Sequence, residues 1–474
     1  MENNTSLISK KLSLKTKLIY GLGQFGDSVP YNLFSLYFLF YLTDVVGMNP
    51  TVAGTISSCA VIWNAIANPL VGNMSDNCRS KHGRRRPFML VGFPMIMIAI
   101  LLLFAPVGLT GTIQSIYYLF VALLFWTAYV TYLIPFAALG AELTDDYNER
   151  TSLRSYTSFI AYAVLTLVSS GPAFIQSRML PKGYSVHEAW TVTGYILVAL
   201  VAIFCFICWK GLAGTEKVTI TDRTSALPKE NIFKTVKEIM TIKAYRIIVF
   251  MVVAYVIGAT IQTTGLIYLL TYAANLDYSA QTLFWLITGI IDILIVPVIA
   301  NVAFKAGKKS TLLFAMSMVA LLFIAFGFIG IHNAVTIYAY AISIFIFAIS
   351  FWVLYIPLTY DIAEIDEWKF GKRREGMHVS FVLFVQKIGA AIASFLVGIM
   401  LTAVGYQAGV AQSPEVVEGM VRILTFVPAI FIIIAVLIFS RYPITQRNFN
   451  ALKSALEAKK AGKEYSDEEF KELL

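Results

Sequence analysis

The chain has 474 residues, of which 58% are hydrophobic and 14% are charged, and its mean hydropathy is +0.72. Soluble globular chains carry roughly 25% charged residues, so this composition excludes a soluble protein. The net charge of +9 would by itself suit a nucleic-acid partner, but the placement of the positive residues argues against one.

Apolar runs of about 20 residues, long enough to cross a bilayer, recur along the whole chain. This pattern predicts an all-α integral membrane protein with twelve transmembrane helices. The predicted spans cover residues 18–43, 51–74, 88–107, 114–142, 153–177, 190–209, 247–273, 281–304, 310–331, 335–361, 376–404 and 423–440.

Nearly all lysines and arginines lie in loops that this assignment places on one side of the membrane, together with both termini. The opposite side carries Arg178, Lys182 and Arg422. By the positive-inside rule, both termini are predicted to be cytoplasmic in a multi-pass protein of the cell's inner membrane. The basic charge therefore indicates topology in a lipid bilayer, and we predict no nucleic-acid partner.

A long polar linker divides the spans into two sets of six. We predict an N-terminal six-helix bundle at residues 1–209 and a C-terminal six-helix bundle at 247–440. Residues 210–246 form the cytoplasmic linker between them, and residues 441–474 form a cytoplasmic tail.

The two halves resemble each other in sequence, which indicates a repeat. "NPLVGN" in the second span matches "VPVIAN" in the eighth when Pro69 is aligned with Pro297, and this alignment places Asp292 on Asn64. "PFAALGAE" in the fourth span likewise matches "PLTYDIAE" in the tenth. Two parallel six-helix pseudo-repeats are typical of the major facilitator fold, in which the substrate site lies between the halves near the midplane.

Charged clusters at the cytoplasmic ends of the spans predict a gate. The loop "SDNCRSKHGRRRP" joins a carboxylate to a basic run, and such groups can pair with each other and cap helix ends. The alternative is a basic loop that meets lipid phosphate. The gating residues that we predict are Asp76, Arg84, Arg85, Glu142, Arg150, Glu364 and Arg373.

Several strings together resemble the glycoside–pentoside–hexuronide cation symporters of the major facilitator superfamily. They are "YGLGQFGDS", "YLTDVVGM", "IWNAIANPLVG", "GRRRPF" and "IDEWKFGKRREG". These strings span both halves and keep their order. The resemblance implies a secondary transporter of a sugar, glycoside or uronide that works by alternating access, and not an enzyme with catalytic residues.

The resemblance also implies where a coupling cation would bind. Sodium-coupled relatives have carboxylates at the positions that are Asn64 and Asn68 here, and amide oxygens bring no charge. Lys387 matches the family's lysine near the cation site, and Asp27 and Asp292 are the carboxylates nearest to mid-span. Because an intramembrane lysine needs a partner, we predict that Lys387 pairs with Asp27 or Asp292 and that the coupling ion is a proton. A static charge pair is the alternative.

A sugar site needs polar groups that match hydroxyls and a flat ring for the pyranose face. The resemblance places Trp352 at an aromatic position that faces the sugar cavity, whereas the family's sugar-binding carboxylate falls at Ser28, beside Asp27. The substrate-binding residues that we predict are Asp27, Tyr31, Asn32, Asn64, Trp126, Tyr129, Gln262, Trp352 and Tyr355.

Other functions fit parts of the same pattern. A sodium-coupled or uncoupled transporter would share this architecture, and so would a carrier of an amphiphilic solute, because apolar residues such as Leu133 and Ala137 lie where sugar-binding residues are expected. An integral-membrane enzyme is the alternative from another class. The histidines are scattered and no P-loop is present, so we predict no metal site and no cofactor beyond a coupling H+ or Na+. The sequence does not indicate the oligomeric state.

Overall fold

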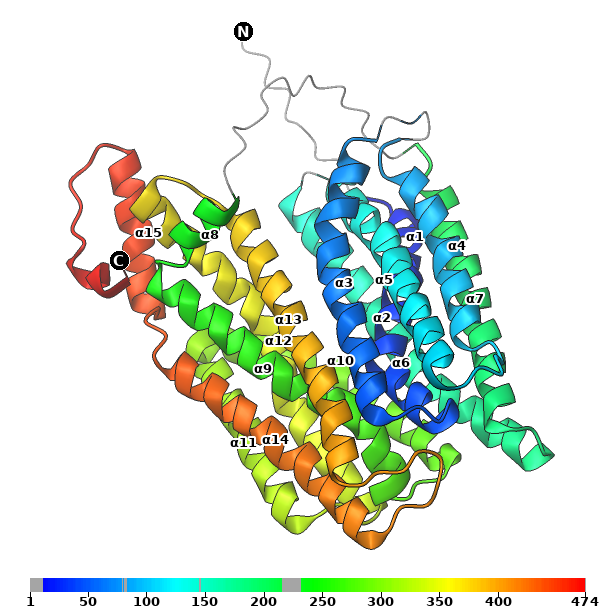
Figure 1. The fold of residues 1–474 in the computed structure, drawn as a ribbon. Coiled ribbons are helices and arrows are strands. Elements are labelled where there is room, and N and C mark those ends of the chain that lie inside the picture. Colours follow the sequence, from blue (N-terminus) through cyan, green and yellow to red (C-terminus); the bar gives the residue numbers. More distant parts are fainter. Residues whose placement is uncertain (1–11, 79, 81–82, 145, 215–231, 474) are drawn as a thin grey trace. The chain divides into compact units, whose positions relative to one another are not determined.

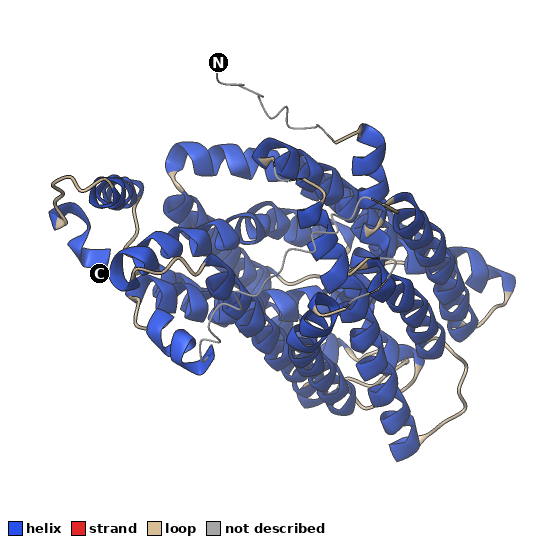
Figure 2. Cartoon of the chain, turned by 90° about the horizontal axis from the view of Figure 1, so that it is seen from above, coloured by secondary structure: helices blue, strands red, loops and turns tan. Residues whose placement is uncertain are grey.

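The computed structural model describes residues 12–78, 80, 83–144, 146–214 and 232–473 of the chain (Figure 1). Over these residues the protein is built from helices and the loops between them, and no β-strand occurs (Figure 2). The fold class predicted from the sequence, an all-α membrane protein, is confirmed.

Eleven of the described helices are long and apolar enough to cross a membrane. Their lengths match or exceed the number of residues that a helix needs to cross the hydrocarbon core. They are α3 (Pro50–Asp76), α4 (Arg86–Leu103), α5 (Gly111–Glu142), α6 (Tyr147–Met179), α7 (Val186–Gly211), α9 (Lys243–Tyr268), α10 (Tyr278–Ala306), α11 (Lys308–Ile329), α12 (Ala334–Phe370), α13 (Glu375–Ala403) and α14 (Pro414–Ser440).

The remaining predicted span, residues 18–43, is helical but is not one continuous α-helix. Its Pro30 has no backbone N–H to donate, and the helix widens into two π turns beyond that residue, a geometry that is frequent at functional sites. The segments are α1 (Leu14–Leu22), α2 (Gln24–Leu33), η1 (Phe34–Phe38) and η2 (Tyr41–Val45).

The chain divides into two compact units, of which the first comprises residues 1–34 and 63–221. It contains α1, α2, most of α3 and the helices α4 to α7. Close packing in this unit depends on small residues, as is common between membrane helices. A Cβ atom on Gly92 of α4 would lie only 2.7 Å from the backbone nitrogen of Tyr132 in α5, so glycine is required where these two helices meet.

The second unit comprises residues 35–62 and 222–474. Helix α9 packs against α12, α13 and α14 within it. Tyr255 of α9 stacks on Phe351 of α12 with 3.8 Å between the ring centroids. The short helices η3 (Leu180–Lys182) of the first unit, and α8 (Ile232–Ile239) and η4 (Leu269–Ala273) of the second, complete the membrane domain.

Residues 35–62 form a helical hairpin that belongs to the same compact unit as the C-terminal helices. We call this segment the outer hairpin, because the sequence predicts that its turn lies on the non-cytoplasmic side. The domain boundary at the 210–246 linker stays a prediction from the sequence. Residues 215–231 of that linker lie outside the described residues.

The C-terminal tail folds back onto the end of α12. It contains α15 (Gln446–Lys460) and η5 (Glu468–Leu473). The indole of Trp368 lies edge-on to the rings of Tyr465 and Phe470, with centroids 5.3 and 5.0 Å away. The ammonium of Lys459 lies 4.6 Å from the same indole. Trp368 therefore joins the tail to the membrane domain.

Candidate substrate and coupling site

The first unit holds a carboxylate inside its helical bundle. Asp27 of α2 accepts a hydrogen bond of 2.9 Å from the hydroxyl of Tyr129 in α5. A carboxylate within a membrane-spanning segment is costly and usually marks a substrate or ion pathway. One hydrogen bond leaves most of the acceptor capacity of this carboxylate available.

Aromatic rings surround this carboxylate. The ring of Trp126 lies edge-on to that of Tyr129, with 5.1 Å between centroids. The ring of Tyr31 lies 6.4 Å from that of Trp126, and Tyr31 is 41% exposed. The indole nitrogen of Trp126 is buried without a hydrogen-bond partner among the described residues. The structure thus brings together Asp27, Tyr31, Trp126 and Tyr129, four of the residues predicted for substrate binding.

Two other predicted residues are satisfied within their own helices. The side-chain amide of Asn68 donates to the backbone oxygen of Asn64 at 2.5 Å and to its side-chain oxygen at 2.7 Å. Asn32 donates in the same way to the carbonyl of Ser28 at 2.7 Å. The pair on α3 consequently presents a neutral, partly self-satisfied group at the position where sodium-coupled relatives have two carboxylates.

The second unit carries its own polar and aromatic group on α12 and α13. The hydroxyl of Tyr355 donates to the side-chain oxygen of Gln386 at 3.2 Å, next to Lys387 in sequence. The ring of Trp352 lies edge-on to that of Tyr355 at 6.0 Å, and Trp352 is 42% exposed. Gln262 of α9 is buried, and its amide nitrogen has no hydrogen-bond partner among the described residues.

Asp292 of α10 lies between isoleucines in the sequence of its helix. The predicted pairing of Lys387 with Asp27 or Asp292 stays a prediction.

The predicted gating residues of the first unit meet each other. Arg84 contacts Glu142 at 2.7 Å and Arg85 contacts it at 3.4 Å. Arg85 also donates to the hydroxyl of Ser75 at 3.1 Å. These contacts tie the loop between α3 and α4 to the end of α5. The side chain of the predicted partner Asp76 lies outside the described residues.

In the second unit, Arg373 contacts Glu375 at 2.6 Å, Glu364 at 3.2 Å and Glu367 at 3.6 Å. Arg373 is half exposed, and its hydrogen bond to Glu375 raises the pKa of its guanidinium above the usual value. Arg150 of the first unit donates to the backbone oxygen of Thr144 at 2.9 Å.

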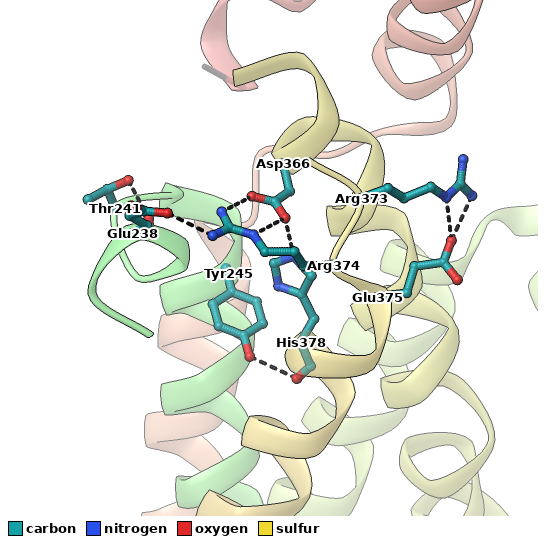
Figure 3. A network of polar contacts seen from close by, with 8 residues as sticks. All are labelled: Glu238, Thr241, Tyr245, Asp366, Arg373, Arg374, Glu375 and His378. Carbon is teal, nitrogen blue, oxygen red and sulfur yellow. Dashed lines mark hydrogen bonds and ion pairs between the residues drawn. The ribbon is translucent and has the colours of Figure 1, made fainter. Parts of the chain in front are cut away.

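A charge network that was not predicted from the sequence lies beside Arg373 and is centred on the buried Asp366 (Figure 3). Arg374 donates to both carboxylate oxygens of Asp366, at 2.6 and 2.9 Å, and to Glu238 of α8 at 2.7 Å. His378 lies 3.1 Å from the same carboxylate, and Tyr245 donates to the carbonyl of His378 at 2.8 Å. The network holds α8, α9, α12 and α13 together.

Asp366 is fully buried, and its hydrogen bonds to Arg374 raise the pKa of that guanidinium far above the usual value. A sequence signal was present. Asp366 follows Leu358 and Ile362 at helical spacing on the face of α12 that is buried. A carboxylate on an apolar face predicts a partner.

A comparison with protein families decides the class. A family model described as "MFS/sugar transport protein" matches residues 19–446. The chain belongs to this family. The resemblance to glycoside–pentoside–hexuronide symporters of the major facilitator superfamily is confirmed, and because the family consists of transporters, a membrane enzyme is excluded.

Individual proteins agree with this membership. The chain is 27% identical over 465 residues to a protein of Bacillus subtilis named as the uncharacterized symporter YjmB. The alignment covers 95% of this chain and 96% of that protein. It is 25% identical to a glucuronide carrier protein homolog of Escherichia coli, over 96% and 97% of the two chains. The crystal structure of a D-xylose–proton symporter matches with a TM-score of 0.63 at 14% identity, over 91% of this chain and 96% of the other, which shows a shared fold.

Proposed function

We propose that this transporter carries a sugar, glycoside or uronide together with a proton, by alternating access of its two halves. The observation that carries the proposal is the Asp27–Tyr129 hydrogen bond inside a group of aromatic side chains.

The chemistry of the first-unit group suits a sugar. A carboxylate accepts hydrogen bonds from two adjacent hydroxyls, and an indole or phenol face packs against the apolar face of a pyranose ring. Tyr31 is exposed beside Asp27, so a ring could stack on it while its hydroxyls bond to the carboxylate. The printed name of the glucuronide carrier homolog supports a sugar-type substrate.

The amide pair on α3 supports a proton as the coupling ion. Sodium needs hard oxygen ligands, usually with negative charge nearby, and Asn64 and Asn68 offer amide oxygens without negative charge. The side-chain oxygen of Asn64 already accepts one hydrogen bond from Asn68. Asp27, in the same unit, is a carboxylate that can exchange a proton.

The test is uptake of a panel of labelled sugars, glycosides and glucuronides into proteoliposomes, with a pH gradient and a sodium gradient imposed separately. We expect accumulation driven by the pH gradient for at least one sugar. Accumulation driven only by sodium, or only equilibration, would replace the proton proposal by the sodium-coupled or uncoupled alternative. Uptake of amphiphiles without any sugar would reject the substrate class.

A gain-of-function variant sharpens the test. Replacing both Asn64 and Asn68 by aspartate restores the two carboxylates of sodium-coupled relatives. We expect the double variant to show sodium-stimulated uptake that the unmodified chain lacks. The matched control is Asn73→Asp, which adds a carboxylate at an exposed position of the same helix and should confer no sodium response.

We further propose the orientation given by the charge distribution, with both termini in the cytoplasm. Impermeant maleimide reagents applied to spheroplasts and to inverted vesicles would distinguish the two orientations. After Cys59 and Cys78 are replaced by serine, a cysteine placed at Glu464, which is exposed in the tail, should react only in inverted vesicles.

A further inference from the structure

We propose that Asp44, in the outer hairpin, is a proton-binding site that controls how firmly this hairpin docks on the C-terminal helices. Nothing in the mechanism above uses this carboxylate. The inference requires only that the protein is a transporter whose outer end opens and closes, and it does not depend on the solute or on the coupling ion.

The outer hairpin contacts α13 closely enough to act as a seal. The hydroxyls of Thr51 and Thr402 lie 2.8 Å apart. A Cβ atom on Gly54 would lie 2.9 Å from the backbone oxygen of Ser394. Close approach of this kind requires glycine and is lost as soon as the two segments separate.

Asp44 belongs to the same hairpin, and its carboxylate accepts hydrogen bonds from two chains of hydroxyl groups. Thr43 donates to one carboxylate oxygen at 2.6 Å, and the hydroxyl of Tyr268 lies 2.8 Å from that of Thr43. Tyr272 donates to the other oxygen, and Tyr406 donates to Tyr272 at 3.4 Å. The three tyrosines come from α9, η4 and the loop after α13, so the cluster joins the hairpin to the rest of the unit.

The cluster contains no counter-charge. Among the described residues, no lysine, arginine or histidine pairs with Asp44, and the titratable groups that face it are Tyr268, Tyr272, Tyr278 and Tyr406. Burial, and secondarily the nearby carboxylate, raise the pKa of the Tyr406 hydroxyl far above its usual value. That phenol therefore remains a hydrogen-bond donor throughout the physiological pH range.

The geometry accommodates both protonation states of Asp44. The ionised carboxylate accepts from Thr43 and Tyr272. In the acid form, its O–H can donate to the Thr43 oxygen, because the Thr43 proton has a second acceptor in the carbonyl of Phe40 at 3.2 Å. Tyr268 can still donate to the remaining lone pair of Thr43. A proton can thus bind without displacing the backbone.

Proton binding and docking then favour each other. In the docked hairpin, the carboxylate is removed from water without a counter-charge, which favours the neutral acid. In the undocked hairpin, water solvates the carboxylate and the proton dissociates at its ordinary acidity. By linkage, acidification strengthens docking and alkaline conditions weaken it.

The test measures the distance between spin labels at Val52 and Val410, two exposed positions on the hairpin and on the loop after α13. Cys59 and Cys78 are first replaced by serine, whereas the other two cysteines are fully buried. We expect the population with the short distance to grow as the pH falls from about 8 to about 5. We expect Asp44→Asn to hold that population high at every pH. A pH response in this variant equal to that of the unmodified chain, or no response in the unmodified chain, would overturn the inference.

A second variant and a control keep the test independent of folding defects at Asp44. Tyr272→Phe removes a donor to the ionised form, so the midpoint should move upward by about one to two pH units. Thr402→Val removes a hydrogen bond of the same seal without a titratable group, so it should lower the docked population while the pH response remains. An unmoved midpoint in Tyr272→Phe would contradict the proposal. Because distances are measured without substrate, failure of sugar uptake leaves this result intact.

Discussion

Two carboxylates, one in each unit, are held in opposite ways. Asp27 has one neutral hydroxyl partner, Tyr129. Asp366 has a bidentate arginine, Arg374, and a histidine, His378. A carboxylate surrounded by charged donors is fixed in its ionised form, whereas one with a single neutral donor can take up a proton or a ligand. The same functional group therefore has a structural role in one unit and is chemically available in the other.

The largest effect that this comparison predicts is on stability. Asp366→Ala leaves Arg374 buried with Glu238 as its remaining partner, and removing one partner of a buried ion pair costs about 3–5 kcal/mol. We expect a loss toward the lower end of that range in the free energy of unfolding, measured by denaturation in detergent. A loss below about 1 kcal/mol would show that the ion pair of Asp366 contributes no more to stability than a pair on the surface.

Asp27→Asn should reduce transport and leave stability almost unchanged. We expect uptake to fall by about tenfold to hundredfold, because hydrogen bonds to a charged group contribute about 1.5–3 kcal/mol. The unfolding free energy should change by less than about 0.5 kcal/mol. Asp467→Asn, at an exposed position in the tail, is the control and should alter neither. Normal uptake by Asp27→Asn would remove this residue from the site.

Arg373 offers a contrast within the same loop as Arg374. It contacts three carboxylates but is half exposed, and exposed ion pairs contribute about 0–1 kcal/mol. Arg373→Ala should therefore cost far less stability than Arg374→Ala. Equal costs in the same denaturation experiment would mean that burial does not decide the strength of these pairs.

The smallest predicted effect is on the pH dependence of stability. Lys17 donates to Glu149 at 2.9 Å, and this hydrogen bond lowers the pKa of the Glu149 carboxyl below its usual value. Its contribution to stability is therefore present above the ordinary glutamate pKa and is lost as the pH falls through the lowered value. In the Glu149→Gln variant, the temperature of the unfolding midpoint should change less between about pH 5 and pH 3 than it does in the unmodified chain. If the unfolding midpoint of the variant changed with pH as much as that of the unmodified chain, the contact between Lys17 and Glu149 would not contribute to stability.

The fold was predictable from sequence because hydropathy and charge asymmetry act over whole helices. The exception is the span at 18–43, where Pro30 signals an interruption but does not reveal the π turns that follow. The gating pair of Arg84 with Glu142 was also accessible, since opposite charges lie at the ends of adjacent helices.

The individual partners within the candidate site were less accessible. The sequence shows that Asn64 and Asn68 are one helical turn apart, but only the rotamers show that they bond to each other. The link between Asp27 and Tyr129 depends on the register between α2 and α5, which hydrophobic patterns do not fix. The partners of Asp366 were not predicted, because a run of both signs in sequence does not show which members face the protein interior.

The contacts of Trp368 with the tail have a practical consequence. Phe470 and Leu473 are buried, so η5 is held against the protein. A truncation that removes η5 would uncover the indole of Trp368 and the apolar side chains that pack against it. Shortened expression variants without η5 should therefore aggregate more readily during purification.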